Sequence, residues 1–152
     1  KMKQYKLIAA YNVIKSMNST GMKGISLSTQ LKLYNLQKQL TPAYEFQIDK
    51  EKAIFEEYPP TRIDNGSVIY EHDDGTPDIE KVQACQKLID ELNNLDNDSI
   101  KIEPIHISLK EAEALKPDSD RNIMEAIDGI LVIDMDEEPQ IQIVPMDMEV
   151  SN

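Results

Sequence analysis

The sequence predicts an α+β domain in which helices dominate. Three long segments place apolar residues at three- and four-residue steps, the spacing of one helix face. Two shorter segments alternate apolar and polar residues, and Asp64-Asn65-Gly66-Ser67 is a turn typical of a β-hairpin. A chain of 152 residues fits one ordinary domain. We therefore predict one α+β domain over residues 1–133, containing a helical hairpin over 1–58, followed by an acidic C-terminal extension over 134–152.

The helical hairpin is expected to begin with a helix over residues 4–17. The composition of residues 18–24 favours a turn, after which Ser26 or Ser28 can cap a second helix. The apolar residues of that helix include Leu31, Leu33, Leu36 and Leu40. Pro42 predicts a kink or a restart in it, because proline is tolerated in the first turn of a helix but not in its interior. The helix then continues to Tyr58, before two prolines.

The second part of the domain is expected to alternate strands and helices. Residues 62–70 form the hairpin, residues 78–95 a third helix, and residues 100–107 a strand with a break or an edge position at Pro104. We expect the segments 62–70 and 100–107 to build one small sheet.

The last part of the domain is expected to hold two short helices. Ser108 and Glu111 form a capping box that opens a helix ending at Leu115. Asp118 or Ser119 caps another. The apolar stripe of this last helix is formed by Ile123, Met124, Ile127, Ile130 and Leu131, and Gly129 offers an alternative, earlier end. In the extension, the alternation of residues 141 and 143 indicates one more strand before a loose end.

Charge is distributed unequally along the chain. Residues 1–50 carry eight lysines and two acids, a net charge of +6, whereas residues 51–152 carry eight basic residues and 26 acids, a net charge of −18. Such asymmetry marks either a surface for a charged partner or two halves that attract each other within a monomer or an oligomer.

Composition favours a cytoplasmic protein, in the host cytoplasm if the chain is viral. Cys85 is the only cysteine, which excludes an internal disulfide, and its place among apolar helix positions indicates a buried residue. No segment approaches the roughly 18 consecutive apolar residues that a membrane span requires. We expect no membrane contact and no cofactor.

Few residues suggest chemistry. The cluster that most resembles a metal site comprises His72, Asp73, Asp74 and Asp78. Its spacing matches no defined motif, so an ordinary acidic loop is the favoured interpretation, and a metal-dependent hydrolase using it is the weakest alternative. His106, between two isoleucines of a predicted strand, should point away from the face that they share. We predict no catalytic residues.

The charged segments supply candidates for partner binding. The residues singled out are Lys6, Lys15, Lys32, Lys38, Asp134, Asp136, Glu137 and Glu138. Nucleic-acid binding by the lysines is disfavoured, because the excess of acids elsewhere would repel a polyanion. An alternative is that the acidic surface mimics nucleic acid and occupies a basic site on a host defence protein.

The order of elements resembles that of small uncharacterised proteins encoded by tailed bacteriophages. The residues that carry the resemblance are the helix over Tyr5–Met17, a helix ending in KEKAIFEEY at 50–58, the turn at 64–66, IDELNNL at 89–95 and IKIEPIHISL at 100–109. The resemblance covers most of residues 5–133 and implies a viral origin, but it transfers no site residues. Pro42 and the acidic segment after Ile133 depart from the pattern.

From these observations we predict a phage-type accessory protein that binds a host or phage protein and does not act as an enzyme. A small virion or assembly component that forms a homo-oligomer through its basic and acidic halves is the first alternative. Exposed charge in such a protein would contribute to association rate and specificity more than to affinity.

Overall fold

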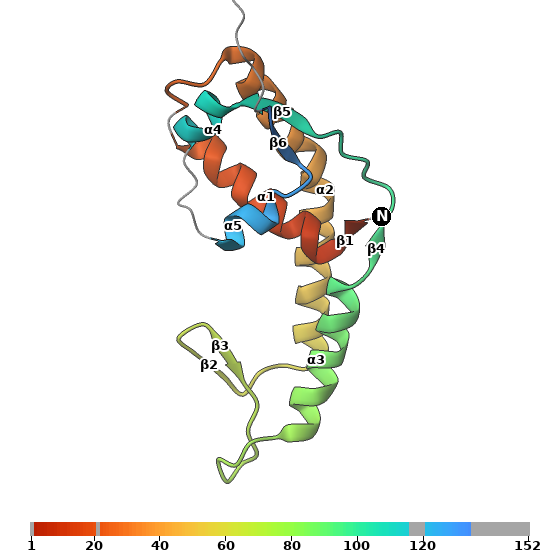
Figure 1. Ribbon diagram of the computed structural model, residues 1–152. Coiled ribbons are helices and arrows are strands. Elements are labelled where there is room, and N and C mark those ends of the chain that lie inside the picture. The colour runs from red at the N-terminus through yellow and green to blue at the C-terminus, as the bar shows by residue number, and fades with distance from the viewer. Residues whose placement is uncertain (1, 21, 116–120, 135–152) are drawn as a thin grey trace, which may run out of the picture. The chain divides into compact units, whose positions relative to one another are not determined.

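The fold is α+β and mostly helical, as predicted. The computed structural model describes residues 2–20, 22–115 and 121–134, which form five helices and three two-stranded sheets (Figure 1). These residues cluster into two compact units. The first comprises the chain up to Asn12 together with Leu36–Lys101, and the second comprises Val13–Asn35 together with the chain from Ile102 onward. Helices α1 (Gln4–Ser19) and α2 (Leu27–Glu57) contribute to both.

In the first unit, the start of α1 packs against the middle of α2. Tyr11 stacks on Tyr44, with 4.4 Å between ring centroids and an angle of 17° between the rings. The buried side chain of Gln4 donates from Nε2 to the carbonyl of Ala43 at 2.7 Å, and its Oε1 accepts from Nδ2 of Asn97 at 3.0 Å. Both ends of this buried amide are therefore satisfied, and they tie α1 to the short sheet of β1 (Met2–Lys3) and β4 (Asp96–Asn97).

The second helix passes through Pro42 without restarting, contrary to one of the two expected outcomes there. Residues 27–57 form a single helix. Thr41 does not cap a new segment, because its hydroxyl donates to the carbonyl of Gln37 at 2.9 Å, a bond made inside a helix. The neighbouring residues Leu36, Leu40 and Ala43 are buried. Burial on this face compensates for the backbone bond that proline cannot donate.

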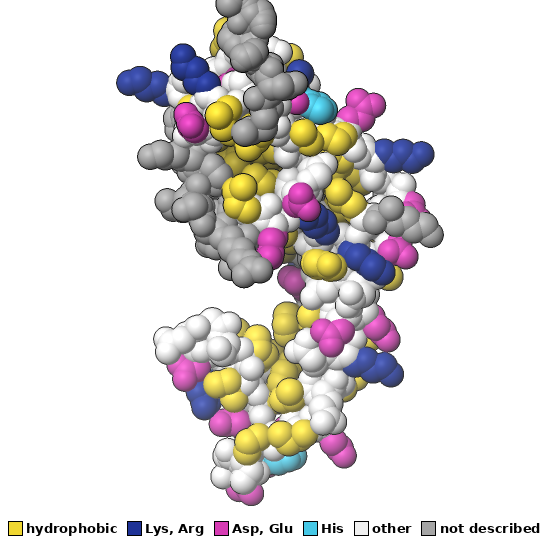
Figure 2. All heavy atoms as spheres, viewed as in Figure 1, with side chains coloured by type: hydrophobic (Ala, Val, Ile, Leu, Met, Phe, Trp, Pro, Cys, Tyr) yellow, Lys and Arg dark blue, Asp and Glu magenta, His cyan; other side chains and the backbone are white. Residues whose placement is uncertain are grey.

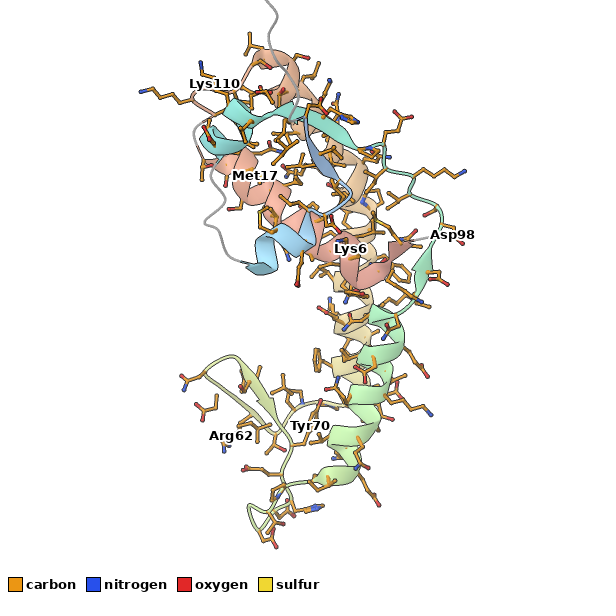
Figure 3. All side chains as sticks on the ribbon, viewed as in Figure 1. Lys6, Met17, Arg62, Tyr70, Asp98 and Lys110 are labelled. Carbon is orange, nitrogen blue, oxygen red and sulfur yellow. The ribbon has the colours of Figure 1, made fainter. Side chains whose placement is uncertain are left out.

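The first unit also contains the predicted hairpin and the third helix. Strands β2 (Arg62–Asp64) and β3 (Ser67–Ile69) are joined by Asn65 and Gly66, whose φ angles are 50° and 81°, as a type I′ turn requires. Helix α3 (Ile79–Asn93) runs beside α2 (Figure 1). Tyr70, labelled in Figure 3, follows the hairpin and donates from its hydroxyl to the carbonyl of Tyr58 at 2.5 Å. Cys85 of α3 is buried, as predicted, with its Sγ 3.5 Å from that hydroxyl.

The second unit is built around a parallel pair of strands. Strand β5 (Ile105–Ser108) pairs with β6 (Leu131–Asp134), so that Ile105 lies beside Leu131 and Ile107 beside Ile133. Helices α4 (Leu109–Leu115) and α5 (Arg121–Ala126) lie between these strands in the chain. The buried core of this unit includes Ile14, Ile25, Leu33, Ile105, Ala126 and Ile130.

One detail of the predicted β structure is wrong. The segments 62–70 and 100–107 do not share a sheet, because among the described residues the hairpin pairs only with itself and β5 pairs with β6. Of the two alternatives for the end of the last helix, the early stop at Gly129 is the one observed, so residues 130 and 131 do not extend it. Gly129 adopts a φ of 78°, a left-handed conformation that ends helices, and the chain turns there into β6. The strand predicted at residues 141 and 143 and the cap at 118 or 119 lie outside the described residues.

Candidate functional site

The acidic loop at residues 71–78 is organised as a turn and a helix cap. Asp78 is the N-cap of α3, because its Oδ1 accepts from the backbone N–H of Lys81 at 3.2 Å. Its Oδ2 lies 3.8 Å from Nδ1 of His72. Asp74 accepts from the hydroxyl of Thr76 at 2.6 Å and from its backbone N–H at 2.9 Å, which lowers the pKa of Asp74. Asp73 is exposed.

The carboxylate oxygens of Asp74 and Asp78 therefore accept hydrogen bonds from the loop itself and from the start of α3. Within the described ranges, no group of three or more His, Cys, Asp or Glu side chains is arranged to hold a metal ion. The loop is mostly exposed, as the sequence predicted.

His106 points to the exposed face of β5, away from the buried Ile105 and Ile107, as predicted. Its Nδ1 lies 2.9 Å from Oδ1 of Asp134 on β6. Both side chains are about half exposed, at 59% and 48%. On the same strand, the hydroxyl of Ser108 accepts from the N–H of Glu111 at 3.1 Å and caps α4, as the capping-box pattern predicted. The contact between His106 and Asp134 therefore joins β5 and β6 at the surface.

The predicted partner-binding residues do not form one cluster. Lys15 and Lys32 belong to the second unit and are exposed, whereas Lys6 and Lys38 belong to the first. Asp134 ends β6. The other acidic candidates, at positions 136–138, lie outside the described residues.

The structure shows an apolar groove in the second unit that the sequence did not indicate. Its volume is about 380 Å³, and it is lined by elements that are far apart in the chain: α1, β5, α4, α5 and β6. Three of its lining residues are buried, namely Met17, Ile107 and Ile127. Four more are partly or largely accessible, namely Leu115, Met124, Leu131 and Ile133. Figure 2 shows hydrophobic side chains gathered over α4, α5 and β6, and Figure 3 labels Met17 among them.

The groove is present because the two helices beside the strands are short. A parallel pair of strands normally has both faces covered by helices. Here α4 has seven residues and α5 has six, which is about two turns each. Ile107, Leu131 and Ile133 share one face of the sheet because of the parallel register. Helices this short leave part of that apolar face accessible.

The polar groups of the groove are acidic. Glu113 of α4 and Asp128, just after α5, line it, and both are exposed. Methionine side chains are flexible and polarizable, so a groove that contains Met17 and Met124 can adapt to apolar side chains of different shapes. Two carboxylates beside such a lining favour a ligand that combines apolar side chains with positive charge.

Two cavities in the first unit have a larger share of polar or charged residues in their lining than the groove has. One, of about 470 Å³, includes Gln4 and residues 95–100 in its lining. The other, of about 310 Å³, lies between α2 and α3 and includes Lys50, Glu57 and Glu91. Half of the lining residues of the first are polar or charged, and a third of those of the second are charged. The groove of the second unit is therefore the stronger candidate for binding an apolar segment.

Glu111 supports one wall of this unit. Its Oε2 accepts from the backbone N–H of Ser26 at 3.0 Å, and its Oε1 accepts from the hydroxyl of Thr29 at 3.2 Å. The Ser26 hydroxyl accepts in turn from the N–H of Thr29 at 3.2 Å, so Ser26 caps α2, one of the two predicted choices. Burial acts to raise the pKa of Glu111, but these hydrogen bonds outweigh it and hold the pKa below its ordinary value. Glu111 thereby fixes α4 to the start of α2.

No protein-family model matches the chain, and no curated protein or solved structure is significantly similar to it. The resemblance to phage proteins therefore stays a prediction from the sequence. Among the described residues, no helix combines the length and the apolar content that crossing a membrane requires.

Proposed function

We propose that this chain acts by binding a protein and not by catalysis, and that the groove of the second unit takes up a basic amphipathic segment of its partner. The observation that carries this proposal is the accessible apolar lining of Leu115, Met124, Leu131 and Ile133 beside the carboxylates of Glu113 and Asp128. The sequence resemblance makes a host or phage protein the expected class of partner.

The affinity expected of such a groove is modest. Burying a Leu- or Met-sized side chain contributes about 1.5–3 kcal/mol, and a segment with three such anchors gains on the order of 5–9 kcal/mol before costs. Association and side-chain ordering oppose this gain by several kcal/mol. Even with a contribution from the two acidic side chains, the net gain is about 4–5.5 kcal/mol, so a dissociation constant on the order of 0.1–1 mM is the reasonable expectation.

The carboxylates should act mainly on association rate and specificity. Glu113 and Asp128 are exposed, so their attraction for a basic segment is screened by salt. A partner segment with Leu at helical spacing and Lys at the remaining positions would satisfy both the apolar lining and the acidic groups. An acidic segment of equal apolar content should bind much less tightly.

The experiment is a titration of the full chain with a synthetic peptide of that design, followed by calorimetry. Met124→Lys places a positive charge in the groove and should weaken binding at least tenfold. Val82→Lys is the matched control, because Val82 is an exposed apolar residue of α3 in the first unit. Peptide binding that is equally strong in the native chain and in Met124→Lys would refute the assignment of the site.

The acidic groups are tested separately. Exchanging the peptide's Lys for Glu, with Leu unchanged, should weaken binding at low salt about tenfold or more, because repulsion replaces attraction at both carboxylates. An acidic peptide that binds as well as the basic one would show that charge plays no part in recognition.

A further inference from the structure

We propose that the segment which occupies the groove is the exposed face of residues 27–34 from a second copy of this chain. This inference rests on the proposed function of the groove and names its partner. It joins two different surfaces of the second unit, both present in every copy.

The exposed face is an apolar stripe on α2 comprising Leu27, Leu31 and Tyr34. These residues are separated by four and three positions, which places them on one side of the helix. Their exposed fractions are 81%, 59% and 56%. Leu33, on the other side, is fully buried. The beginning of α2 therefore has two apolar faces, of which only one is used in the core of its own chain.

The spacing of this stripe is the spacing by which helices bind apolar grooves. Helix-in-groove recognition uses anchors at positions i, i+4 and i+7, and the three stripe residues occupy those positions. Leu27 and Leu31 can fill an apolar groove, while Tyr34 brings a large ring with a polar end.

Charge favours the stripe over residues 135–152 as the occupant of the groove. Residues 1–44 contain seven lysines and no acid, so the stripe belongs to a basic part of the chain, although helical spacing places Lys32 off the face that the stripe occupies. The groove presents Glu113 and Asp128. In contrast, residues 135–152 of the chain contain five acids and no lysine or arginine. Repulsion by the two groove carboxylates disfavours that segment as the occupant and favours the basic start of α2.

The same charges determine the geometry of association. Two grooves placed face to face would bring Glu113 and Asp128 near their own copies, whereas a groove against the basic part of the chain that carries the stripe avoids this repulsion. Such a contact joins unlike surfaces, so on a dimer one groove and one stripe do not take part in it, and association can continue to a ring or a chain.

The test uses the full chain in analytical ultracentrifugation over a range of concentrations and salt. The native chain should associate reversibly, and high salt should weaken the association. Leu31→Gln removes a stripe anchor, and Met124→Lys puts a charge into the groove; each alone should raise the dissociation constant at least tenfold. Val82→Lys should associate as the native chain does. Circular dichroism checks that each variant keeps its helical content.

Mixing the two variants gives the decisive result. The chain with Leu31→Gln keeps its groove and the chain with Met124→Lys keeps its stripe, so an equimolar mixture should form dimers that grow no further. A mixture that stays monomeric, or single variants that associate like the native chain, would overturn the proposal.

The failure of this inference is distinguishable from failure of the proposed function. A native chain that is monomeric at every concentration yet binds the basic peptide refutes the second copy as partner and leaves the groove as a binding site. The same holds if the native chain is monomeric and the double variant Ile141→Asp, Ile143→Asp stays monomeric but binds the basic peptide more tightly, since residues 135–152 would then be the occupant. A chain that neither associates nor binds the peptide refutes both.

Discussion

Glu111→Gln should destabilise the protein measurably at neutral pH, although it replaces one side chain by another of nearly the same size. The carboxylate accepts from the N–H of Ser26 and the hydroxyl of Thr29 at the start of α2. Glutamine keeps one acceptor oxygen for the Ser26 N–H and can meet the Thr29 hydroxyl only through its amide N–H, a neutral bond of reversed direction, and it lacks the negative charge that the N-terminus of a helix stabilises.

The size of the effect follows from these two losses. A hydrogen bond to a charged group contributes about 1.5–3 kcal/mol, and a charge near a helix N-terminus contributes about 0.3–1 kcal/mol. Because Glu111 is only half-buried, solvent screens part of both contributions. We expect the free energy of unfolding to fall by about 1–2 kcal/mol. Glu113→Gln, two residues along the same helix and exposed, is the matched control and should change it by less than about 0.5 kcal/mol.

The dependence on pH separates this explanation from a simple loss of packing. The pKa of Glu111 is lower in the folded chain than its ordinary value of about 4.3. Its contribution is therefore complete above the unfolded pKa and is lost as the pH falls through the folded one. Urea unfolding followed by circular dichroism should show a clear difference between the native chain and Glu111→Gln at about pH 7, and a smaller one at about pH 3. A difference of the same size at both pH values, or none at neutral pH, would refute the reasoning.

Two further predictions concern the first unit. Tyr70→Phe should lower the free energy of unfolding by about 1–2 kcal/mol, because it leaves the carbonyl of Tyr58 without its donor. Unfolding in urea measures this loss, and an unchanged midpoint would contradict the prediction. Burial raises the pKa of Tyr70, so in the native chain its ionisation should occur at higher pH than that of exposed tyrosines, and loss of Tyr70 should remove only that late step from the ultraviolet titration. Gln4→Leu should cost about 1–3 kcal/mol, since Asn97 loses its acceptor and the Ala43 carbonyl, which also accepts within α2, loses its second donor in a buried place. Asn97→Ala in the Gln4→Leu chain should cost less than it does in the native chain, and purely additive losses would show that the two side chains are not coupled.

Local patterns in the sequence predict much of the fold. The hairpin at 64–66, the helix from Ile79 and the capping of α4 by Ser108 all depend on residues close together in the chain, and the structure confirms each of them. The burial of Cys85 and the outward direction of His106 follow from helix and strand periodicity in the same way.

What could not be predicted depends on contacts between distant residues. A run of isoleucines around Pro104 indicates a strand but not its partner, and β6 was not predicted because Ile127, Ile130 and Leu131 also fit helical spacing. The capping-box pattern places Glu111 at the start of its own helix, yet its carboxylate binds Ser26, 85 positions earlier in the chain. Leu31 and Leu33 look alike in the sequence, and only the packing of α2 shows that one is exposed and the other buried.

The groove likewise depends on contacts between residues that are far apart in the chain. Its lining comes from five elements, so no single segment of the sequence contains its pattern. The signal that was available was indirect: two short predicted helices beside strands rich in isoleucine cannot cover an apolar sheet face completely. Because the short helices leave part of the sheet face uncovered, Met124 remains 48% exposed.

The measurement that tests the central claim most directly is methyl NMR of the full chain with labelled methionines, titrated with the basic amphipathic peptide. The methyl signals of Met17 and Met124, which line the groove, should shift in proportion to the bound fraction. The signal of Met2, which belongs to the first unit, should stay in place. Unchanged signals of Met17 and Met124 at saturating peptide would contradict the account.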